Sequence, residues 1–451
     1  MTVTEILQIA DRVVFSETGK HLDNLQEAVI KGVWQGETYR EIAKECNHSE
    51  GRVRDVGYKL WEILSQQLGE NINKSNFRST FERLQLTSSQ INIQSSHNFI
   101  SCSYPHQSIS RNEKEPSDQQ LPYCNLKQAP KLISCYGRKN ELLTLSQWLE
   151  NPKNTLIAVL GIAGIGKSTL VRYFLDINTQ EFDIIIWKNL KLSQSLDFLL
   201  TEIFTDIQAN NSSQNTNNML SQFLNLLNQK RCLIILDNIE EIFIPQQLAG
   251  MYQPEYQDYQ KLFTMITEVE HQSHVVLISQ EQCPEMECLD QELYPIKSLE
   301  VSDLSTVEIL KDTGLKHEDS WLKLMKLYEG NPGYLKSIAI SIKNIFDGDV
   351  SEFLADNSLI ITPNMQYNFN QLFNRLSPIE KQLILELSKF DQPVSREDLR
   401  QSLDLSSMDL INGLQSLQQR YLVTKIKADK ILFKLSSVFQ EYVKNCCQDE
   451  I

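Results

Sequence analysis

A glycine-rich loop at positions 161–168, with the sequence GIAGIGKS, most constrains how this chain can fold. The loop follows the apolar, β-prone run Thr155–Leu160 and precedes a helical stretch over Thr169–Asp176. A backbone loop whose amides converge on one anion needs a strand and a helix N-terminus to hold it in place. The sequence therefore predicts an α/β domain built around this loop.

The loop matches the pattern GxxxxGK[ST], which is typical of a phosphate-binding loop (P-loop). Its glycines allow successive backbone N–H groups to point at phosphate oxygens, and the following helix adds its N-terminal dipole. Lys167 can reach the β- and γ-phosphates, and the Ser168 hydroxyl can ligate Mg²⁺. We therefore expect a purine nucleotide, ATP or ADP, together with Mg²⁺. The predicted nucleotide contacts in this loop are Gly161, Gly164, Gly166, Lys167, Ser168 and Thr169.

An apolar strand that ends in an acidic residue follows later in the chain, in the run LIILD that ends at Asp237. A carboxylate at such a strand end suits Mg²⁺ or its bound water, so Ser168 and Asp237 are the predicted metal ligands. Asn238 comes next and cannot act as a general base. Glu240 and Glu241 follow, and either could orient a water, although solvated loop charges are the simpler interpretation. The candidate catalytic residues are Asp237, Glu240 and Glu241.

Further apolar, β-prone runs recur along this part of the chain, and helical stretches separate them. This alternation is typical of a parallel sheet that is covered by helices on both faces. The predicted strands are Thr155–Leu160, Ile184–Trp187, Cys232–Leu236 and Val275–Ile278.

Downstream of this α/β region the strands give way to helical patterns over 301–354 and 370–447. In the second stretch, Ser377, Pro378 and Glu380 combine an N-cap, a proline at the first helical position and a returning carboxylate. The same stretch ends in a hairpin, which predicts a winged helix. Its predicted strands are Val394, Tyr421–Ile426 and Ile431–Leu435.

The N-terminal region shows the pattern of several short helices. Thr38 with Glu41 fits a capping box that opens a helix over Tyr39–Cys46. After a turn, Ser49 can cap a longer helix, so the two helices form a helix-turn-helix. Ser, Asn, Gln and Pro then dominate without any period, which predicts a flexible linker. The predicted domains are a helix-turn-helix domain at 1–86, a linker at 87–130, a nucleotide-binding domain at 131–299, a helical domain at 300–365 and a winged helix at 366–451.

The composition argues against several classes of partner. The formal net charge of −15 disfavours wholesale binding to nucleic acid or anionic lipid, because both need a positive potential. No apolar run reaches the ~18–20 residues of a membrane helix, and the N-terminus lacks the order of a signal peptide. The nine cysteines are scattered, as reduced thiols usually are, and we interpret His271 and His274 as surface residues rather than metal ligands. We therefore expect a cytoplasmic protein with no membrane partner.

Taken in order, several motifs resemble those of the NB-ARC family of STAND nucleotide switches, over about residues 133–445. They are CYGRKNE at 135–141, GIAGIGKS at 161–168, the strand ending in Asp237, HVVLISQ at 274–280 and GNPGYL at 330–335. The resemblance implies that Arg138 flanks the adenine and that Pro332 packs near the base. It also implies an adenine-nucleotide switch built from a P-loop domain, a helical domain and a winged helix.

Three positions depart from the family's pattern. Asn238 stands where the family usually has a second acidic residue, and Gln280 where it usually has an arginine that detects the γ-phosphate. Ser436 stands near the place of a histidine that faces the ADP β-phosphate, so Gln280 and Ser436 are both candidate nucleotide contacts. Replacing an arginine by glutamine removes a charge-assisted contact, a loss of roughly 1.5–3 kcal/mol. We therefore expect tight nucleotide binding with slow or absent hydrolysis.

Residues 1–86 resemble the helix-turn-helix domain found at the front of bacterial vWA-MoxR-associated and NB-ARC proteins, on the motifs WQG and YREIA and the helix after Ser49. DNA reading needs cations on the second helix. The cations there are Arg52, Arg54 and Lys59, and acidic residues lie among them. The segment holds 11 Lys and Arg against 13 Asp and Glu, so DNA and an effector protein are equal candidates for its partner. Trp34 and Trp61 are interpreted as core residues.

Three functions are open on this sequence. They are a regulatory switch whose N-terminal domain gives the output, a DNA-binding regulator with a structural ADP-filled module, and an active ATPase. We favour the switch, in bacterial signalling, transcription control or defence, with a homo-oligomer as its activated form. Family members usually carry a C-terminal repeat array that senses the trigger, whereas this sequence ends at Ile451. We therefore expect sensing to come from a partner, from a direct ligand, or from nowhere if the gene is truncated.

Overall fold

The computed structural model describes most of the chain. The described residues are 6–7, 10–11, 14, 22–35, 37–46, 48–68, 72–74, 77, 122–131, 134–178, 181–191, 194–208, 219–286, 295–355 and 358–447. Contacts divide the chain into two units, Met1–Arg111 and Asn112–Ile451. Within the described ranges, no helix is long and apolar enough to cross a membrane.

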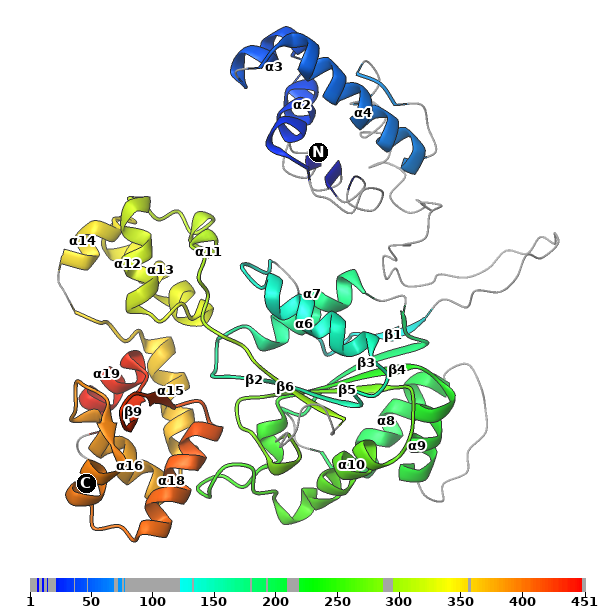
Figure 1. Ribbon diagram of the computed structural model, residues 1–451. Helices are drawn as coiled ribbons and strands as arrows, with labels where there is room; N and C mark the ends of the chain where they lie inside the picture. The colour runs from blue at the N-terminus through cyan, green and yellow to red at the C-terminus, as the bar shows by residue number, and fades with distance from the viewer. Residues whose placement is uncertain are drawn as a thin grey trace. The chain divides into compact units, whose positions relative to one another are not determined.

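The described part of the N-terminal unit is helical, and it is drawn in blue in Figure 1. Its labelled helices are α2 (Asn24–Gln35), α3 (Tyr39–Glu45) and α4 (Glu50–Leu68). The predicted capping box opens α3, because Thr38 Oγ1 accepts from the N–H of Glu41 at 3.3 Å and Glu41 Oε2 accepts from the N–H of Thr38 at 2.7 Å. Trp34 and Trp61 are buried, and both rings pack against Phe77. The interpretation of the two tryptophans as core residues is therefore confirmed.

The second unit is organised by a six-stranded sheet in the order β1-β3-β4-β5-β2-β6, in which every neighbouring pair is parallel (Figure 1). The strands are β1 (Tyr123–Asn125), β2 (Leu156–Leu160), β3 (Ile184–Asn189), β4 (Cys232–Asp237), β5 (His274–Ser279) and β6 (Ile296–Glu300). Every residue of β2, β4 and β5 is buried, as a parallel sheet covered on both faces requires. The predicted α/β fold with a parallel sheet is thus confirmed.

Helices cover both faces of this sheet, with α6 and α7 on one side and α8, α9 and α10 on the other (Figure 1). They span α6 (Lys139–Glu150), α7 (Lys167–Ile177), α8 (Leu196–Gln208), α9 (Met219–Gln229) and α10 (Gln257–Glu268). Because successive strand residues point to opposite faces, Ile157 and Val159 join the core under α6 and α7, whereas Ala158 and Leu160 join the core under the other three helices.

Two strands were missed by the sequence analysis. Strand β1 lies inside the stretch 87–130 that was predicted to be a linker, and its Tyr123 pairs with Ile184 of β3. Strand β6 forms the opposite edge of the sheet beside β2. The apolar-run criterion failed because β1 is only three residues long and β6 is a partly exposed edge strand that contains Lys297 and Ser298.

Helices follow the sheet and share one continuous hydrophobic core with the C-terminal part of the chain. They are α11 (Glu308–Lys311), α12 (Trp321–Leu327), α13 (Pro332–Ile345), α14 (Val350–Ala355), α15 (Pro363–Arg375), α16 (Pro378–Ser388), α17 (Arg396–Ser402), α18 (Ser407–Gln419) and α19 (Ser437–Cys446). The Tyr334 ring on α13 lies 5.5 Å from the Phe369 ring on α15, centroid to centroid. That contact ties the first helical group to the second.

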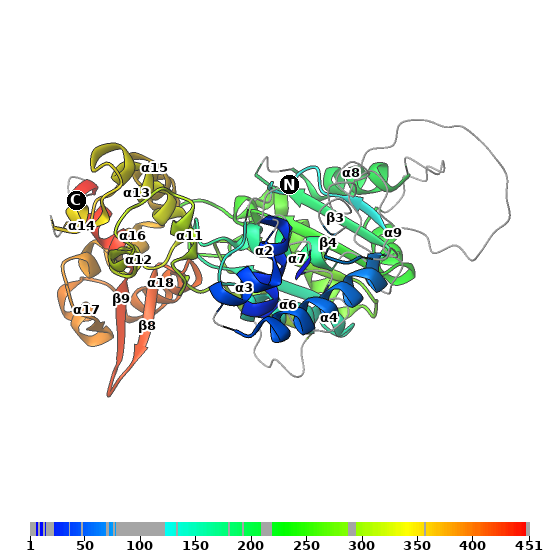
Figure 2. The ribbon, with the colours of Figure 1, turned by 90° about the horizontal axis from the view of Figure 1, so that it is seen from above.

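A small sheet with strand order β7-β9-β8 accompanies these last helices. It consists of β7 (Val394–Ser395), β8 (Val423–Lys427) and β9 (Ile431–Leu435), and Figure 2 shows the β8–β9 hairpin projecting from the helices. The predicted capping box opens α16, since Ser377 Oγ accepts from the N–H of Glu380 at 3.3 Å. Helices α16 to α18 with this antiparallel sheet are consistent with the predicted winged helix.

The interpretation of His274 as a surface residue is wrong. His274 is the first residue of β5 and is fully buried, and its Nδ1 lies 2.8 Å from the carbonyl oxygen of Asn154. His271 is half-buried, with Nε2 3.0 Å from the carbonyl oxygen of Ile266. The error arose because β5 begins one residue before the apolar run does. Burial lowers the pKa of His274 to about 4.

Acid should destabilise the protein through His274. Its folded-state pKa of about 4 lies below the ordinary value of 6.5, so the unfolded chain takes up the proton first as the pH falls. The contribution of a neutral His274 is fully present above pH 6.5 and is lost as the pH falls towards 4. We expect His274→Gln to flatten the pH dependence of the free energy of unfolding across this window, by up to about 3 kcal/mol.

Urea unfolding at a series of pH values measures this slope. His48→Gln, a change at an exposed histidine of the N-terminal unit, serves as the control and should leave the slope unchanged. Identical slopes for His274→Gln and the unsubstituted chain would contradict the assignment.

Candidate nucleotide site

The P-loop joins the end of β2 at Leu160 to the start of α7 at Lys167. Its three glycines have positive φ angles, +142° at Gly161, +79° at Gly164 and +101° at Gly166, which residues with a Cβ rarely adopt. The helix begins at Lys167, two residues before the predicted Thr169, so Thr169 lies in its first turn. The loop therefore has the strand–loop–helix setting that its sequence predicts.

The Lys167 side chain binds the backbone of the P-loop. Its side chain is buried, and Nζ donates to the carbonyl oxygens of Gly161 at 2.7 Å and Ile162 at 3.0 Å. Burial lowers the pKa of Lys167 to about 8, although the negative charges of Glu240 and Asp237 oppose that shift. The ammonium group thus lies within the loop, close to two carboxylates.

The two predicted metal ligands lie side by side. Ser168 Oγ donates to Asp237 Oδ1 at 3.0 Å, and the same oxygen accepts from the N–H of Asn238 at 3.0 Å. Burial raises the pKa of Asp237 to about 6, whereas the hydrogen bond from Ser168 lowers it. A hydroxyl and a carboxylate offer oxygen atoms, which Mg²⁺ prefers, and Mg²⁺ usually takes its other ligands from water and phosphate. These residues therefore fit that ion.

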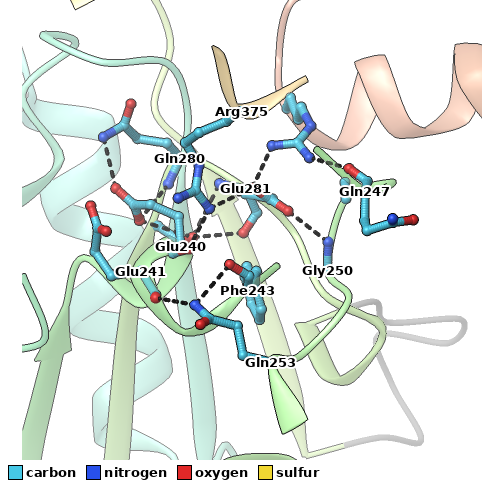
Figure 3. A network of polar contacts seen from close by, with 12 residues as sticks. Glu240, Glu241, Phe243, Gln247, Gly250, Gln253, Gln280, Glu281 and Arg375 are labelled. Carbon is cyan, nitrogen blue, oxygen red and sulfur yellow. Dashed lines mark hydrogen bonds and ion pairs between the residues drawn. The ribbon is translucent and has the colours of Figure 1, made fainter. Parts of the chain in front are cut away.

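Glu240 is not a solvated loop charge, so the simpler interpretation of this residue is wrong. It lies in the 3₁₀ helix Ile239–Ile242 with only 5% of its surface exposed. Its Oε1 accepts from Gln280 Nε2 at 2.7 Å, and its Oε2 accepts from the N–H of Gln280 and from Ser279 Oγ, each at 3.2 Å. Figure 3 shows Glu240 and Gln280 directed at each other. Ser279, the last residue of β5, and Gln280 after it therefore fix the Glu240 carboxylate.

Glu241 differs from its neighbour. It is partly buried, and burial raises the pKa of its carboxyl, which the charge of Arg375 opposes. Its backbone carbonyl accepts from Gln253 Nε2 at 3.0 Å (Figure 3). The structure thus brings Glu240, but not the Glu241 carboxylate, onto Gln280.

Arg138 contacts the backbone of the P-loop. Its guanidinium is buried and donates to Glu141 Oε1 at 2.8 Å, to the carbonyl oxygen of Ser302 at 2.5 Å and to that of Ile165 at 2.8 Å. The contact with Ile165 lies within the loop itself. In this arrangement both terminal nitrogens of the guanidinium donate to protein oxygens.

The N-terminus of α13 packs directly on the P-loop. Pro332 is its first residue, and the preceding Asn331 is its fully buried N-cap. Asn331 Nδ2 donates to the carbonyl oxygen of Ala163 at 3.0 Å, and the N–H of Gly333 donates to that of Gly164 at 3.0 Å. The sequence analysis did not single out Asn331, although an asparagine immediately before a proline is an N-cap signal.

A cavity borders the first half of the P-loop. It is lined by Ile162, Ala163, Gly164, Gly333, Tyr334, Asn364, Met365, Asn368, Phe369, Leu372, Tyr421, Leu422, Ser436 and Phe439. These residues come from the P-loop, α13, α15 and the C-terminal region that contains the small sheet. Lys167, Ser168 and Asp237 are not among them, nor are Arg138 and Gln280. Asn364, Asn368 and Tyr421 were not anticipated from the sequence.

Ser436 lies at this cavity as the N-cap of α19. Its Oγ accepts from the N–H of Phe439 at 3.3 Å and donates to Glu329 Oε2 at 2.5 Å. Glu329 Oε1 also accepts from the N–H of Ser437 at 2.5 Å. Ser436 therefore joins the start of α19 to the turn that precedes α13.

The parallel sheet, the P-loop and the acidic end of β4 together define a P-loop NTPase domain. Comparison with protein-family models agrees: residues 138–292 match the NB-ARC domain, and residues 1–84 match the vWA-MoxR associated protein N-terminal HTH. The chain therefore contains an NB-ARC domain over residues 138–292 and a helix-turn-helix domain of that kind over residues 1–84.

Similar proteins were found among curated sequences and solved structures. An uncharacterized WD repeat-containing protein of Nostoc sp. is 31% identical over 356 residues, which are 74% of this chain and 28% of that protein. The chain thus spans little more than a quarter of that relative. The Walker-type ATPase PABY2304 of Pyrococcus abyssi has 17% identity and a TM-score of 0.48, covering 72% of this chain and 98% of that one. A STAND protein of Pyrococcus horikoshii with a tetratricopeptide repeat sensor has 17% identity and a TM-score of 0.35, covering 70% and 43%.

The contact between the P-loop and α13 should tolerate no side chain at Gly164. A Cβ there would lie 2.9 Å from Asn331 Oδ1 and 3.2 Å from Gly333 Cα. Gly314 has nearly the same backbone, with φ of +77°, but a Cβ there would come no closer than 3.6 Å to Lys343 Nζ. We expect Gly164→Ala to lower the free energy of unfolding by about 1–3 kcal/mol more than Gly314→Ala does, because only the former adds overpacking to backbone strain.

Urea unfolding of the two variants tests this comparison. Equal losses would mean that the loop and α13 do not pack as closely as described.

Proposed function

We propose that the chain is an adenine-nucleotide-dependent regulatory switch of the STAND class, with its output at the N-terminal helix-turn-helix domain. One observation carries the proposal: the cavity beside the P-loop is walled by the C-terminal region that contains the small sheet, through Tyr421 and Ser436. A nucleotide bound in this cavity contacts both the P-loop and the C-terminal region. Its free energy of binding then depends on whether the C-terminal region is closed on the P-loop, which is the requirement for a ligand-controlled switch.

The P-loop residues supply the phosphate side of the proposed site. Lys167 Nζ now donates to two loop carbonyls, and phosphate oxygens are stronger acceptors for an ammonium group than those carbonyls. Ser168 and Asp237 would hold Mg²⁺, which neutralises the charge between the phosphates when it is bound. Thr169 and the first turn of α7 add N–H groups and the helix dipole.

The other predicted contacts take different places in the proposed site. Asn331 and Pro332 begin α13, whose Gly333 and Tyr334 line the cavity, and Ser436 borders it as the N-cap of α19. Arg138 acts through the P-loop backbone at Ile165 rather than on the nucleotide. Gln280 acts through Glu240.

We propose slow hydrolysis for a reason that is visible in the polar contacts. Glu240 is one of the two carboxylates whose charge acts on Lys167, and Gln280 and Ser279 occupy both of its oxygens. A base that is fixed by three donors is poorly placed to take a proton from water. Gln280 also brings no positive charge to a transferred phosphoryl group.

The output is assigned to the exposed face of α4. This face carries Tyr58, which is 73% exposed, and Arg54, whose guanidinium pairs with Glu50 at 2.7 Å. Arg54 is therefore partly neutralised before it meets a partner. The mixed charge of this face favours an effector protein over DNA, because DNA binding draws on unpaired cations.

Nucleotide binding should depend on Lys167. We expect Lys167→Ala to weaken ADP binding roughly 10- to 150-fold, the factor that corresponds to a charge-assisted contact of about 1.5–3 kcal/mol. Lys153 is an exposed lysine of the same domain, so Lys153→Ala is the control and should bind as the unsubstituted chain does. Fluorescence polarisation of a labelled ADP measures the affinities. Equal affinity in the two variants would remove the basis of the proposal.

Hydrolysis should be slow. We expect phosphate release from ATP at no more than about 10⁻³ s⁻¹, the order seen in an NTPase that lacks its catalytic arginine. Fast release that disappears in Asp237→Ala and in a double Glu240→Gln, Glu241→Gln variant would instead identify an active ATPase. Fast release that survives in both variants would point to a contaminating enzyme.

A further inference from the structure

The β8–β9 hairpin concentrates positive charge on a chain that is acidic as a whole. Over 423–435 it holds four lysines and a single acidic residue, Asp429, so its net charge is +3, whereas the whole chain carries −15. Figure 2 shows the hairpin projecting from the helices beside it. The charge therefore lies on a part of the second unit that a large partner can reach.

The lysines of the hairpin are largely free of protein partners. Lys425 and Lys427 are exposed, and neither side chain forms an ion pair or a hydrogen bond with the residues that the structure describes. Lys430 is also exposed, and its charge lowers the pKa of Asp398 in α17, although hydrogen bonds from Ser395 contribute more to that shift. Two full positive charges are thus available to a partner, with a third close by.

Other cations in the same part of the chain are already paired. Lys389 lies 2.8 Å from a Glu386 carboxylate oxygen, Arg396 lies 3.0 Å from one of Glu397, and Lys444 lies 2.9 Å from one of Asp391. On α4 of the N-terminal unit, Arg54 is paired with Glu50. The absence of carboxylate partners therefore distinguishes the hairpin from these other basic positions.

The strand register places the two unpaired lysines on one face of the ribbon. Side chains alternate along a strand, so Val423, Lys425 and Lys427 point the same way, and the two lysines start from positions about 7 Å apart. Val423 pairs with Leu435, and both are buried in the core. Towards the tip this face passes from the core into solvent, which leaves both ammonium groups outside the packed region.

A surface of unpaired lysines on a narrow ribbon suits duplex DNA. Lysines that neutralise phosphates release condensed counterions, and no protein ion pair has to break first. The major groove of B-DNA is wide enough to admit a two-stranded β-ribbon. An anionic membrane is a poorer fit, because the tip residues Ala428 and Asp429 offer no large apolar side chain for insertion.

The hairpin lacks the side chains that most often read bases. It contains no arginine, asparagine or glutamine, which are the residues whose paired hydrogen-bonding groups recognise guanine and adenine. The neighbouring helix α18 contains no lysine or arginine, and its most exposed apolar residues are Met408 and Ile411. Contacts from this region are therefore expected at phosphates, which position a protein on DNA but carry no sequence information.

We propose that the β8–β9 hairpin is a binding site for duplex DNA, which holds the phosphate backbone through Lys425, Lys427 and Lys430 without reading the base sequence. The site is separate from the P-loop and from the N-terminal helix-turn-helix domain. It requires no bound nucleotide, so it stands or falls independently of the proposed switch.

Fluorescence polarisation of the full chain with labelled DNA duplexes tests this site. Two duplexes of unrelated sequence are titrated at salt concentrations from about 50 to 200 mM, and the logarithm of the association constant is plotted against that of the salt. We expect equal affinities for the two duplexes. In a double Lys425→Gln, Lys427→Gln variant we expect weaker binding and a slope that is shallower by about 2, since each phosphate contact contributes about 0.9.

The matched control removes two lysines elsewhere. Lys323 and Lys326 are exposed on α12, and a double Lys323→Gln, Lys326→Gln variant changes the net charge of the chain by the same amount. This variant should bind DNA with the slope of the unsubstituted chain. Because Lys425 and Lys427 are exposed and unpaired, their substitution removes charge without removing an interaction that the fold depends on.

A double Arg52→Gln, Arg54→Gln variant separates the hairpin from the helix-turn-helix domain. DNA binding that weakens in this variant but keeps its affinity and slope in the hairpin variant overturns the proposal. Absence of DNA binding at the lowest salt concentration overturns it as well. A difference in affinity between the two duplexes that disappears in the hairpin variant would show base reading and contradict phosphate-only contact.

Vesicles of phosphatidylcholine and phosphatidylserine provide the last comparison. Sedimentation with these vesicles that depends on Lys425 and Lys427, without binding to either duplex, would identify a lipid site and overturn the assignment to DNA. Lysine-dependent DNA binding with little or no sedimentation supports it.

Discussion

The close approach of the backbone at Gly164 to the backbone at Gly333 fixes the architecture of the candidate site. A Cβ on Gly333 would lie 2.9 Å from Gly164 Cα, so a side chain at either position would push the P-loop away from α13. Asn331 reinforces the contact, because it caps α13 and also binds the loop. Two helix N-termini, those of α7 and α13, are consequently brought to one loop.

Glu240 contacts both the phosphate side of the candidate site and the helices that follow the sheet. Its charge acts on the Lys167 ammonium, and its backbone carbonyl accepts from Arg375 NH2 at 2.5 Å.

Local sequence signals predicted much of the fold. Apolar runs located β2, β3, β4 and β5 to within one or two residues at their ends, and the capping boxes at Thr38 and Ser377 stand where their side-chain chemistry puts them. Edge strands β1 and β6 escaped because a half-exposed strand carries no continuous apolar run. The burial of His274 was missed because a polar residue at the start of a buried strand cannot be told from the preceding loop by its sequence.

The strand–loop–helix geometry of the P-loop and the Ser168–Asp237 pair were also predictable, because each follows from a motif and the strand beside it. The buried ion pair between Glu281 and Arg420 was not, since the two residues are 139 apart in the chain and no local pattern connects them. The burial of Glu240 could not be seen either, because it depends on Gln280, which the chain reaches only one strand later. Pairings of this kind are set by tertiary packing, which sequence periodicity does not record.

The proposed switch requires that an adenine nucleotide binds in the cavity between the P-loop and the C-terminal helices. The most direct measurement is the identity and amount of nucleotide released when freshly purified protein is denatured, followed by titration of the emptied, refolded chain with ADP. We expect ADP at close to one molecule per chain, and saturable uptake of ADP afterwards. A protein that releases no adenine nucleotide and takes none up would contradict the claim.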